Sequence, residues 1–196
     1  FILMNKKEVF VVGAGPGGYT AAFLAADRGM NVTLIDENLK PGGVCLHKGC
    51  IPSKSLLHLS RLIEETQNAE VCGVIFQPPE IDLNRIREWN SEIISKMANG
   101  LRSLCKQRGV KFVSGRAKFL DGNSLAINNN DKMSFDHCIL ATGSKPFCPS
   151  LFSKIGNRLL TSTSALDLVD IPERLLVVGG GYIGLEMGTV YSSLGS

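Results

Sequence analysis

Two cysteines in a glycine-rich stretch are the residues of this chain best suited to redox chemistry. Cys45 and Cys50 lie in the segment 42–54, which reads GGVCLHKGCIPSK. A zinc site uses about four ligands, usually in repeated C-x2–4-C pairs, and this pair has no matching second pair. A disulfide that closes so short a ring would remove little chain entropy and would be a poor structural staple. The pair therefore favours a disulfide that opens and closes during a reaction.

The residues around the pair indicate where a helix can begin. A disulfide needs Cα atoms within about 7 Å, whereas positions i and i+5 of a regular helix point in different directions. A bridged segment therefore cannot be regular helix, and Gly49 permits the distortion. Pro52 fits only in the first turn of a helix, so we expect one from about Ile51. The positive end of that helix would favour a thiolate on Cys50.

A first glycine turn joins a predicted strand to a predicted helix near the N-terminus. The order is a strand at 8–12, the turn Gly13-x-Gly15-x-x-Gly18, a helix at 19–28 and a strand at 31–35. The glycines permit a tight turn and a close approach to a pyrophosphate, which the start of the helix attracts. Asp36, or Glu37 in its place, would accept hydrogen bonds from ribose hydroxyls. This pattern predicts a dinucleotide site.

A second glycine turn repeats the pattern later in the chain. Gly179-x-Gly181-x-x-Gly184 follows an apolar run at 174–178, predicted as a strand, and precedes a helix predicted at 185–194. It predicts a second dinucleotide site. Two such sites in one chain suggest two cofactors in contact, which serves the transfer of a hydride or an electron pair.

The segments between the two turns predict a mixed α/β fold. Helical spacing extends over 54–67 and 81–108, short β-like runs cover 110–114, 117–120, 124–127 and 135–140, turns include 128–131, and 146–151 reads as a linker. We predict a Rossmann-like domain, with a parallel sheet and a small antiparallel β-meander, over residues 1–148. The start of a second Rossmann-like domain is predicted over 149–196.

Composition excludes several classes of function. The 196 residues carry a net charge of +3 and no basic patch, which argues against nucleic-acid binding. No apolar stretch reaches the roughly 18 residues of a membrane span, and the start, 1–3, is too short for a signal peptide. We therefore expect a cytoplasmic protein, or one of the mitochondrial matrix if it is eukaryotic.

No metal site is expected, and the scattered cysteines should be buried or partly buried thiols: Cys72, Cys105, Cys138 and Cys148.

The motifs in their order resemble the pyridine nucleotide–disulfide oxidoreductases. They are GAGPGG at 13–18, GGVCLHKGCIPSK, ATG at 141–143 and GGGYIGLE at 179–186. Leu46, Ile51 and Ser53 favour the dihydrolipoamide dehydrogenase branch. The resemblance implies oxidation of dihydrolipoamide through a Cys45–Cys50 disulfide and FAD, with reduction of NAD⁺. Alternatives are a glutathione- or mercuric-reductase-type enzyme, or a truncated nucleotide-binding protein without catalysis.

The resemblance also implies a role for individual residues. It places Cys50 against the flavin and makes Cys45 the thiol that exchanges with lipoamide. It brings Lys54 near the flavin, paired with Glu186, and puts Tyr182 over the nicotinamide, although Tyr182 could instead pack on the sheet. The implied FAD residues are Gly13, Gly15, Pro16, Gly18, Asp36, Glu37, Gly42, Gly43, Val44, Thr142 and Gly143. The implied NAD residues are Gly179, Gly181, Tyr182 and Gly184.

The implied partners are dihydrolipoamide or a lipoyl domain, within a homodimeric parent that joins a 2-oxo acid dehydrogenase complex. In that family a C-terminal domain supplies a His–Glu acid/base pair. His47, His58 and His137 do not match that motif, and we expect His47 to be a structural residue, not a base. The chain alone is therefore expected to have little or no lipoamide activity and weakened FAD binding.

Overall fold

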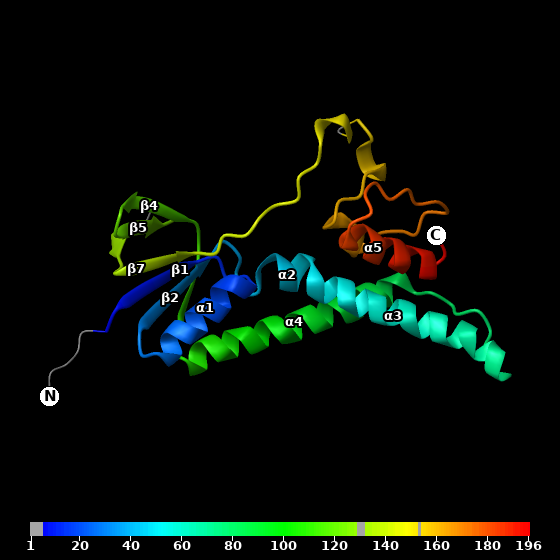
Figure 1. Ribbon diagram of the computed structural model, residues 1–196, viewed down its shortest axis with the longest axis horizontal. Coiled ribbons are helices and arrows are strands. Elements are labelled where there is room, and N and C mark those ends of the chain that lie inside the picture. The colour runs from blue at the N-terminus through cyan, green and yellow to red at the C-terminus, as the bar shows by residue number, and fades with distance from the viewer. Residues whose placement is uncertain (1–5, 129–131, 153) are drawn as a thin grey trace. The chain divides into compact units, whose positions relative to one another are not determined.

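The computed structural model describes residues 6–128, 132–152 and 154–196, in two compact units. The first unit comprises Phe1–His47 and Ser95–Ser144, and the second comprises Lys48–Ile94 and Lys145–Ser196. Figure 1 shows the elements of both units. The predictions for residues 1–3, and for most of the turn at 128–131, lie outside the described residues. The division into domains at residue 148 stays a prediction.

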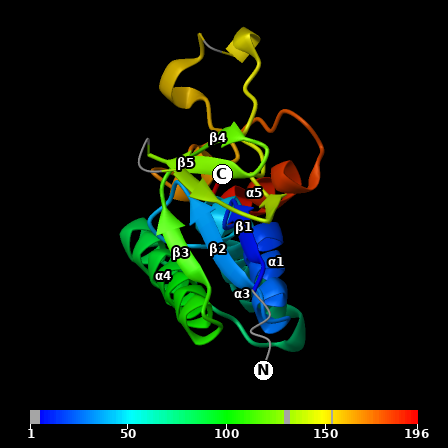
Figure 2. The ribbon, with the colours of Figure 1, turned by 90° about the vertical axis from the view of Figure 1, so that its left-hand side faces the viewer.

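A parallel sheet forms the first unit, in the strand order β3-β2-β1-β7. Its strands are β1 (Glu8–Val12), β2 (Asn31–Asp36), β3 (Lys111–Ser114) and β7 (His137–Leu140). Figure 2 shows β3, β2 and β1 side by side. Helix α1 (Pro16–Asp27) connects β1 to β2, as the sequence predicted. This arrangement confirms the α/β class and the strand–turn–helix–strand unit.

Both faces of the sheet are buried, because successive strand residues point to opposite sides. Val9 and Val11 join a cluster with α1 and with Cys105, which lies in helix α4 (Leu83–Gln107). Phe10 and Ile35 pack on the other face, against residues of the small antiparallel sheet. Strands with two buried faces read as continuous apolar runs, which explains why β1 and β2 could be recognised.

The small antiparallel sheet has the order β4-β5-β6 and confirms the predicted meander. It consists of β4 (Ala117–Asp121), β5 (Ser124–Ile127) and β6 (Lys132–Ser134). The predicted strand at 135–140 is wrong at its start. The chain leaves one sheet after β6, which pairs with β5, and enters the other at β7, which pairs with β1. Phe135 and Asp136 lie between the two strands; the Phe135 N–H donates to the Asn123 carbonyl and the Asp136 N–H to the Glu8 carbonyl, each at 2.9 Å.

Helices dominate the second unit. They are α3 (Cys50–Asn68), the first part of α4, α5 (Tyr182–Ser193) and the short helices η1 (Ala69–Cys72), η2 (Ser150–Phe152), η3 (Gly156–Arg158) and η4 (Ser164–Asp167). Their core contains Leu56 of α3 together with Met187, Val190 and Tyr191 of α5. The Tyr191 hydroxyl donates a hydrogen bond of 2.9 Å to the Ala165 carbonyl. This contact fixes η4 against α5.

The strand predicted at 174–178 is not formed. Leu176 is 85% exposed and Val178 is 72% exposed. A strand exists through its ladder of hydrogen bonds to a neighbour, and no strand among the described residues pairs with this segment. The turn and the helix that follow it do form, because their hydrogen bonds are local. Within the described part of the chain, no helix is both long and apolar enough to cross a bilayer.

Candidate functional site

The first glycine turn leaves no room for side chains. Gly13 has φ +102°, and a Cβ there would overlap the Ala141 carbonyl at the end of β7. A Cβ on Gly18 would overlap the Gly13 carbonyl. Helix α1 begins at Pro16, and its N-cap, Gly15, makes no side-chain hydrogen bond. The amide groups of the first helical turn are therefore not capped by a side chain, which suits an anionic ligand.

Asp36 has a role that the sequence did not reveal. Its carboxylate accepts the Ala14 N–H at 2.7 Å and two hydrogen bonds from Asn38, at 2.8 Å from the backbone and 2.7 Å from the side chain. Asp36 therefore holds the glycine turn. A carboxylate has about four lone-pair sites, so one remains for a ribose hydroxyl. Glu37 instead lies 3.5 Å from Arg116 in an exposed ion pair.

The loop before α2 (Gly43–Lys48) touches the glycine turn directly. Gly42 donates its N–H to the Ala14 carbonyl at 2.8 Å. Gly43 has φ +60°, and a Cβ there would lie 2.5 Å from the Cα of Gly15. Val44 is 53% exposed. The loop therefore lies beside the turn at the carboxyl end of β1, where parallel sheets bind ligands.

The ATG segment reaches the same place from β7. Ala141 donates its N–H to the Val12 carbonyl at 2.8 Å, and Gly13 packs on its backbone. Thr142 and Gly143 follow directly, Gly143 with φ +66°. The structure thus brings together, in the first unit, residues from three separate segments that the resemblance assigns to FAD.

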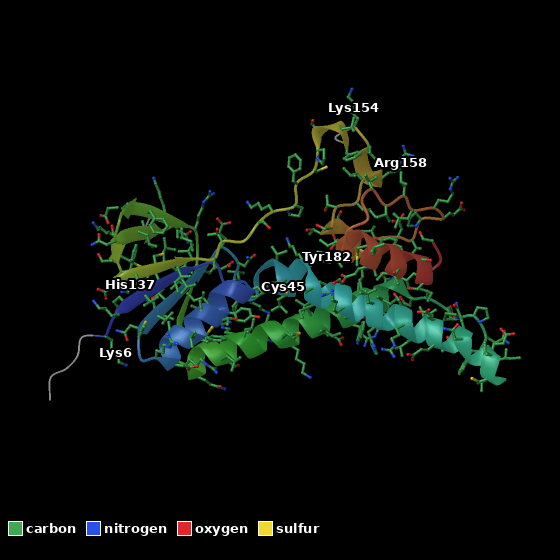
Figure 3. The ribbon with its side chains drawn as sticks, in the orientation of Figure 1. Lys6, Cys45, His137, Lys154, Arg158 and Tyr182 are labelled. Carbon is green, nitrogen blue, oxygen red and sulfur yellow. The ribbon has the colours of Figure 1, made fainter. Side chains whose placement is uncertain are left out.

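The two motif cysteines lie on either side of a break between helices. Cys45, which is labelled in Figure 3, lies on α2 and is half-buried, and Cys50 is exposed at the first position of α3. Between the helices, Gly49 has φ −152° and ψ −116°. The predictions that this segment is not regular helix, and that Pro52 lies in the first turn, are confirmed. Helix α3 begins one residue before the expected start.

The outlying cysteines differ in their environments. Cys105 is buried and Cys138 is half-buried, and burial raises the pKa of both thiols. Cys72 and Cys148 are exposed, so the expectation of burial was wrong for these two. Both lie next to irregular backbone, Cys72 at the end of η1 and Cys148 just before η2. Such connecting segments run over protein surfaces, because buried loops leave backbone groups unpaired.

Lys54 and Glu186 form the ion pair that the resemblance implied. The Lys54 Nζ lies 2.5 Å from the Glu186 Oε1, in the second unit. The hydrogen bond to Glu186 raises the pKa of Lys54 and outweighs desolvation, the next largest cause, which lowers it; the nearby negative charge of Glu186 adds to the rise. Lys54 is therefore a fixed positive charge. Cys50 lies four residues before it, on the same face of α3.

The second glycine turn keeps its helix start. Gly179 has φ +108°, and a Cβ on Gly184 would lie 2.7 Å from the Gly179 carbonyl. The N-cap of α5, Gly181, makes no side-chain hydrogen bond. Tyr182 follows and is 71% exposed, so it is not packed on a sheet (Figure 3). A hollow of about 770 Å³ opens between this turn, α3 and α5.

The histidine between the cysteines is held by the backbone. His47 Nε2 lies 3.2 Å from the Pro41 carbonyl, and the ring is half-buried. This contact supports the structural interpretation of His47. Among the described residues, no cluster of three or more His, Cys, Asp or Glu side chains could hold a metal ion.

Comparisons with known proteins agree with this arrangement. The family model described as "Pyridine nucleotide-disulphide oxidoreductase" matches residues 7–196. The dihydrolipoyl dehydrogenase of Buchnera aphidicola subsp. Schizaphis graminum is 47% identical over 195 residues, covering 97% of this chain and 41% of that protein. The dihydrolipoyl dehydrogenase of Vibrio parahaemolyticus is 44% identical over 194 residues, again covering 97% of this chain and 41% of that protein. The chain thus spans about two fifths of the length of these relatives.

A solved structure is also similar. The HOCl-induced flavoprotein disulfide reductase RclA from Escherichia coli superimposes with a TM-score of 0.80 at 25% sequence identity. The match covers 96% of this chain and 40% of the RclA chain.

Proposed function

Because the chain belongs to the pyridine nucleotide-disulphide oxidoreductase family, we propose that its residues serve the dihydrolipoyl dehydrogenase reaction. In that reaction dihydrolipoamide is oxidised to lipoamide and NAD⁺ is reduced. The observation that carries the proposal is the start of α3, where exposed Cys50 shares a helix face with Lys54, itself paired with Glu186. Helix α2, which carries Cys45, ends just before the break at Gly49.

The residues around the first glycine turn fit FAD. The uncapped start of α1, at Gly15 and Pro16, would hold the pyrophosphate, and Asp36 would accept a ribose hydroxyl. The side-chain-free surface of Gly15 leaves room for close approach. Bound FAD would supply the electron carrier between the thiols and the nicotinamide.

The two cysteines would exchange disulfides with the substrate. One thiolate of dihydrolipoamide attacks the Cys45 sulfur of a Cys45–Cys50 disulfide, and Cys50 leaves as a thiolate. The second substrate thiol, losing its proton, attacks the substrate sulfur of the mixed disulfide, so that lipoamide forms and Cys45 leaves as a thiolate. The two protein sulfurs are then reduced, and their disulfide re-forms when they give up two electrons, which bound FAD would carry to NAD⁺. The positive charge of Lys54 would stabilise the Cys50 thiolate and negative charge at the flavin.

The second glycine turn is proposed to hold NAD. The uncapped start of α5 after Gly181 and the exposed Tyr182 support this.

We further propose that the partner is dihydrolipoamide carried on a lipoyl domain. The whole protein is proposed to be a homodimer within a 2-oxo acid dehydrogenase complex, and to work in the cytoplasm or mitochondrial matrix.

Sequence identity favours lipoamide over the other disulfide substrates. The relatives that are 44–47% identical are named dihydrolipoyl dehydrogenases, whereas RclA is 25% identical. A glutathione- or mercuric-reductase-type substrate remains the alternative that the experiment below distinguishes.

Anaerobic bleaching of the flavin tests the proposal. The whole protein, for which the activity is proposed, is purified, loaded with FAD and mixed with dihydrolipoamide, and the visible flavin absorbance is followed. We expect bleaching that Cys50→Ser abolishes and that the matched change Cys72→Ser, at an exposed cysteine of η1, leaves intact. Equal bleaching in Cys50→Ser would overturn the proposal. Equally fast bleaching by glutathione at the same thiol concentration would favour the alternative substrate.

A further inference from the structure

Two consecutive residues of α3 contact two different helices of the second unit. Lys54 reaches Glu186 of α5, and Ser55 reaches Asn90 of α4. Successive helix residues are turned by about 100°, so one side of α3 faces α5 and another faces α4. Cys50 shares the α5-facing side with Lys54 because the two are four residues apart.

The partner of Ser55 on α4 is a buried side chain. Asn90 is 6% exposed, and its Oδ1 lies 2.5 Å from the Ser55 Oγ. An amide as buried as this one is costly unless it is hydrogen-bonded. The bond to Ser55 therefore constrains how α3 can lie against α4.

Ser55 also bonds to the first turn of α3, so the contact with Asn90 constrains that turn as well. The Ser55 Oγ also lies 2.9 Å from the carbonyl of Pro52, whose side chain is fully buried. Both partners are acceptors, so the one hydrogen of the Ser55 hydroxyl is shared between the Pro52 carbonyl and the Asn90 Oδ1 in a three-centre hydrogen bond. Asn90 is thus linked, through one side chain, to the turn that begins at Cys50.

We propose that Asn90 is a positioning residue for Cys50. Through Ser55 it sets the rotation and the axial position of the first two turns of α3, which carry Cys50 and Lys54. This inference rests on the proposed function, because it takes Cys50 to be the reacting thiol. The aligned amides of the helix start and the Lys54 charge can act on Cys50 only when these turns are ordered.

The test measures the rate at which iodoacetamide alkylates Cys50 in the reduced full chain. Cys72, exposed in η1 beyond the other end of α3, is the internal reference. Cys50 is already exposed, so loosening the helix start removes the local field without adding access. We expect the Cys50-to-Cys72 rate ratio to fall about fivefold in Asn90→Ala and in Ser55→Ala, the effect of one lost hydrogen bond.

The design separates positioning from general destabilisation. The double variant should fall no further than either single one, and Ser55→Thr, which keeps the hydroxyl, should stay near the parent ratio. The control Ser60→Ala removes the 2.8 Å hydroxyl contact between α3 and Ser193 of α5 and should leave the ratio unchanged.

Two outcomes would overturn the inference. One is an unchanged ratio in Ser55→Ala, provided that circular dichroism shows this variant to be folded. Ser55→Ala thus keeps the test decisive even where Asn90→Ala fails to fold. The other is an equal fall in Ser60→Ala. The assay contains neither FAD nor dihydrolipoamide, so its result does not depend on the proposed redox function. A failure of that function and a failure of this inference can therefore be told apart.

Discussion

Gly15 and Gly43 approach so closely that a Cβ on Gly43 would lie 2.5 Å from the Cα of Gly15. Real Cβ atoms essentially never come this near to backbone. The first residue of the cysteine-bearing helix α2 is therefore seated on the glycine turn after β1. Substrate thiol chemistry and dinucleotide binding are proposed for these two segments, and the glycine pair fixes one against the other within the first unit.

Gly43→Ala should disrupt this contact and destabilise the folded chain. The new methyl group would meet backbone, which cannot move aside as a flexible side chain can, and φ +60° is unfavourable for alanine. We expect a loss of about 2 kcal/mol or more in the free energy of unfolding, measured by urea denaturation. Gly100→Ala, in α4 with no atom within 4 Å of the added Cβ, should be neutral or stabilising. An equal effect at both sites would contradict this explanation.

Gly15→Ala separates a ligand site from a purely structural turn. A Cβ there would lie 3.8 Å from the Cα of Gly43, an ordinary contact, and φ is negative. The fold should therefore survive, whereas the methyl group would occupy the approach to a pyrophosphate. We expect FAD binding, followed by flavin fluorescence quenching, to weaken at least tenfold while the melting temperature stays near that of the parent. Unchanged binding would show that the turn serves the fold alone.

Asp36 and Glu37 can be distinguished as ribose ligands. Asp36→Asn turns one acceptor oxygen into an NH2 donor, which would face either the Ala14 N–H or the Asn38 N–H groups that now donate to the carboxylate. It should lower both stability and FAD affinity. Glu37→Gln removes only the exposed pair with Arg116 and should change either by little. Isothermal titration with FAD decides, and a larger loss in Glu37→Gln would reverse the assignment.

The sequence predicted those parts of the site whose hydrogen bonds are local. The first glycine turn with its strands was recognisable because strand, turn and helix follow one another within about 30 residues. The strand predicted at 174–178 failed because a strand needs a neighbour that residue types do not reveal. The contact of Lys54 with Glu186 spans 132 residues and came only from the family resemblance. Ser55 and Asn90 gave no signal, since a serine and an asparagine within helices are ordinary.

Tyr191→Phe should weaken the packing of α5 on η4. The Tyr191 ring is 2% exposed, and its hydroxyl is bonded to the Ala165 carbonyl at 2.9 Å. Removing the hydroxyl leaves that carbonyl without this donor, which costs about 1–2 kcal/mol. Urea denaturation measures the loss, and Tyr182→Phe, at a 71% exposed tyrosine, is the matched control. A loss of similar size in the control would point to an unfolded-state effect.

The Lys54–Glu186 pair should stabilise the fold only while the lysine is charged. The pKa of Lys54 is raised in the folded chain, chiefly by the hydrogen bond to Glu186. The folded state therefore holds the proton more tightly than the unfolded state. The stabilisation is fully present below the unfolded pKa of about 10.4 and is lost as pH rises through the higher folded value. Lys54 is 58% exposed, so solvent screening limits the contribution to below about 1 kcal/mol.

Melting temperatures of the parent and of Lys54→Met between neutral and strongly alkaline pH measure this contribution. We expect the melting temperature of the parent to be slightly higher than that of Lys54→Met at neutral pH, and this difference to disappear above the pKa of Lys54. Arg61→Met provides a comparison, because Arg61 pairs with Glu65 at 2.7 Å on the same helix but does not lose its proton in this range. An advantage over Lys54→Met that persists at the alkaline end would mean that the packing of the lysine stem, not its charge, stabilises α3 against α5.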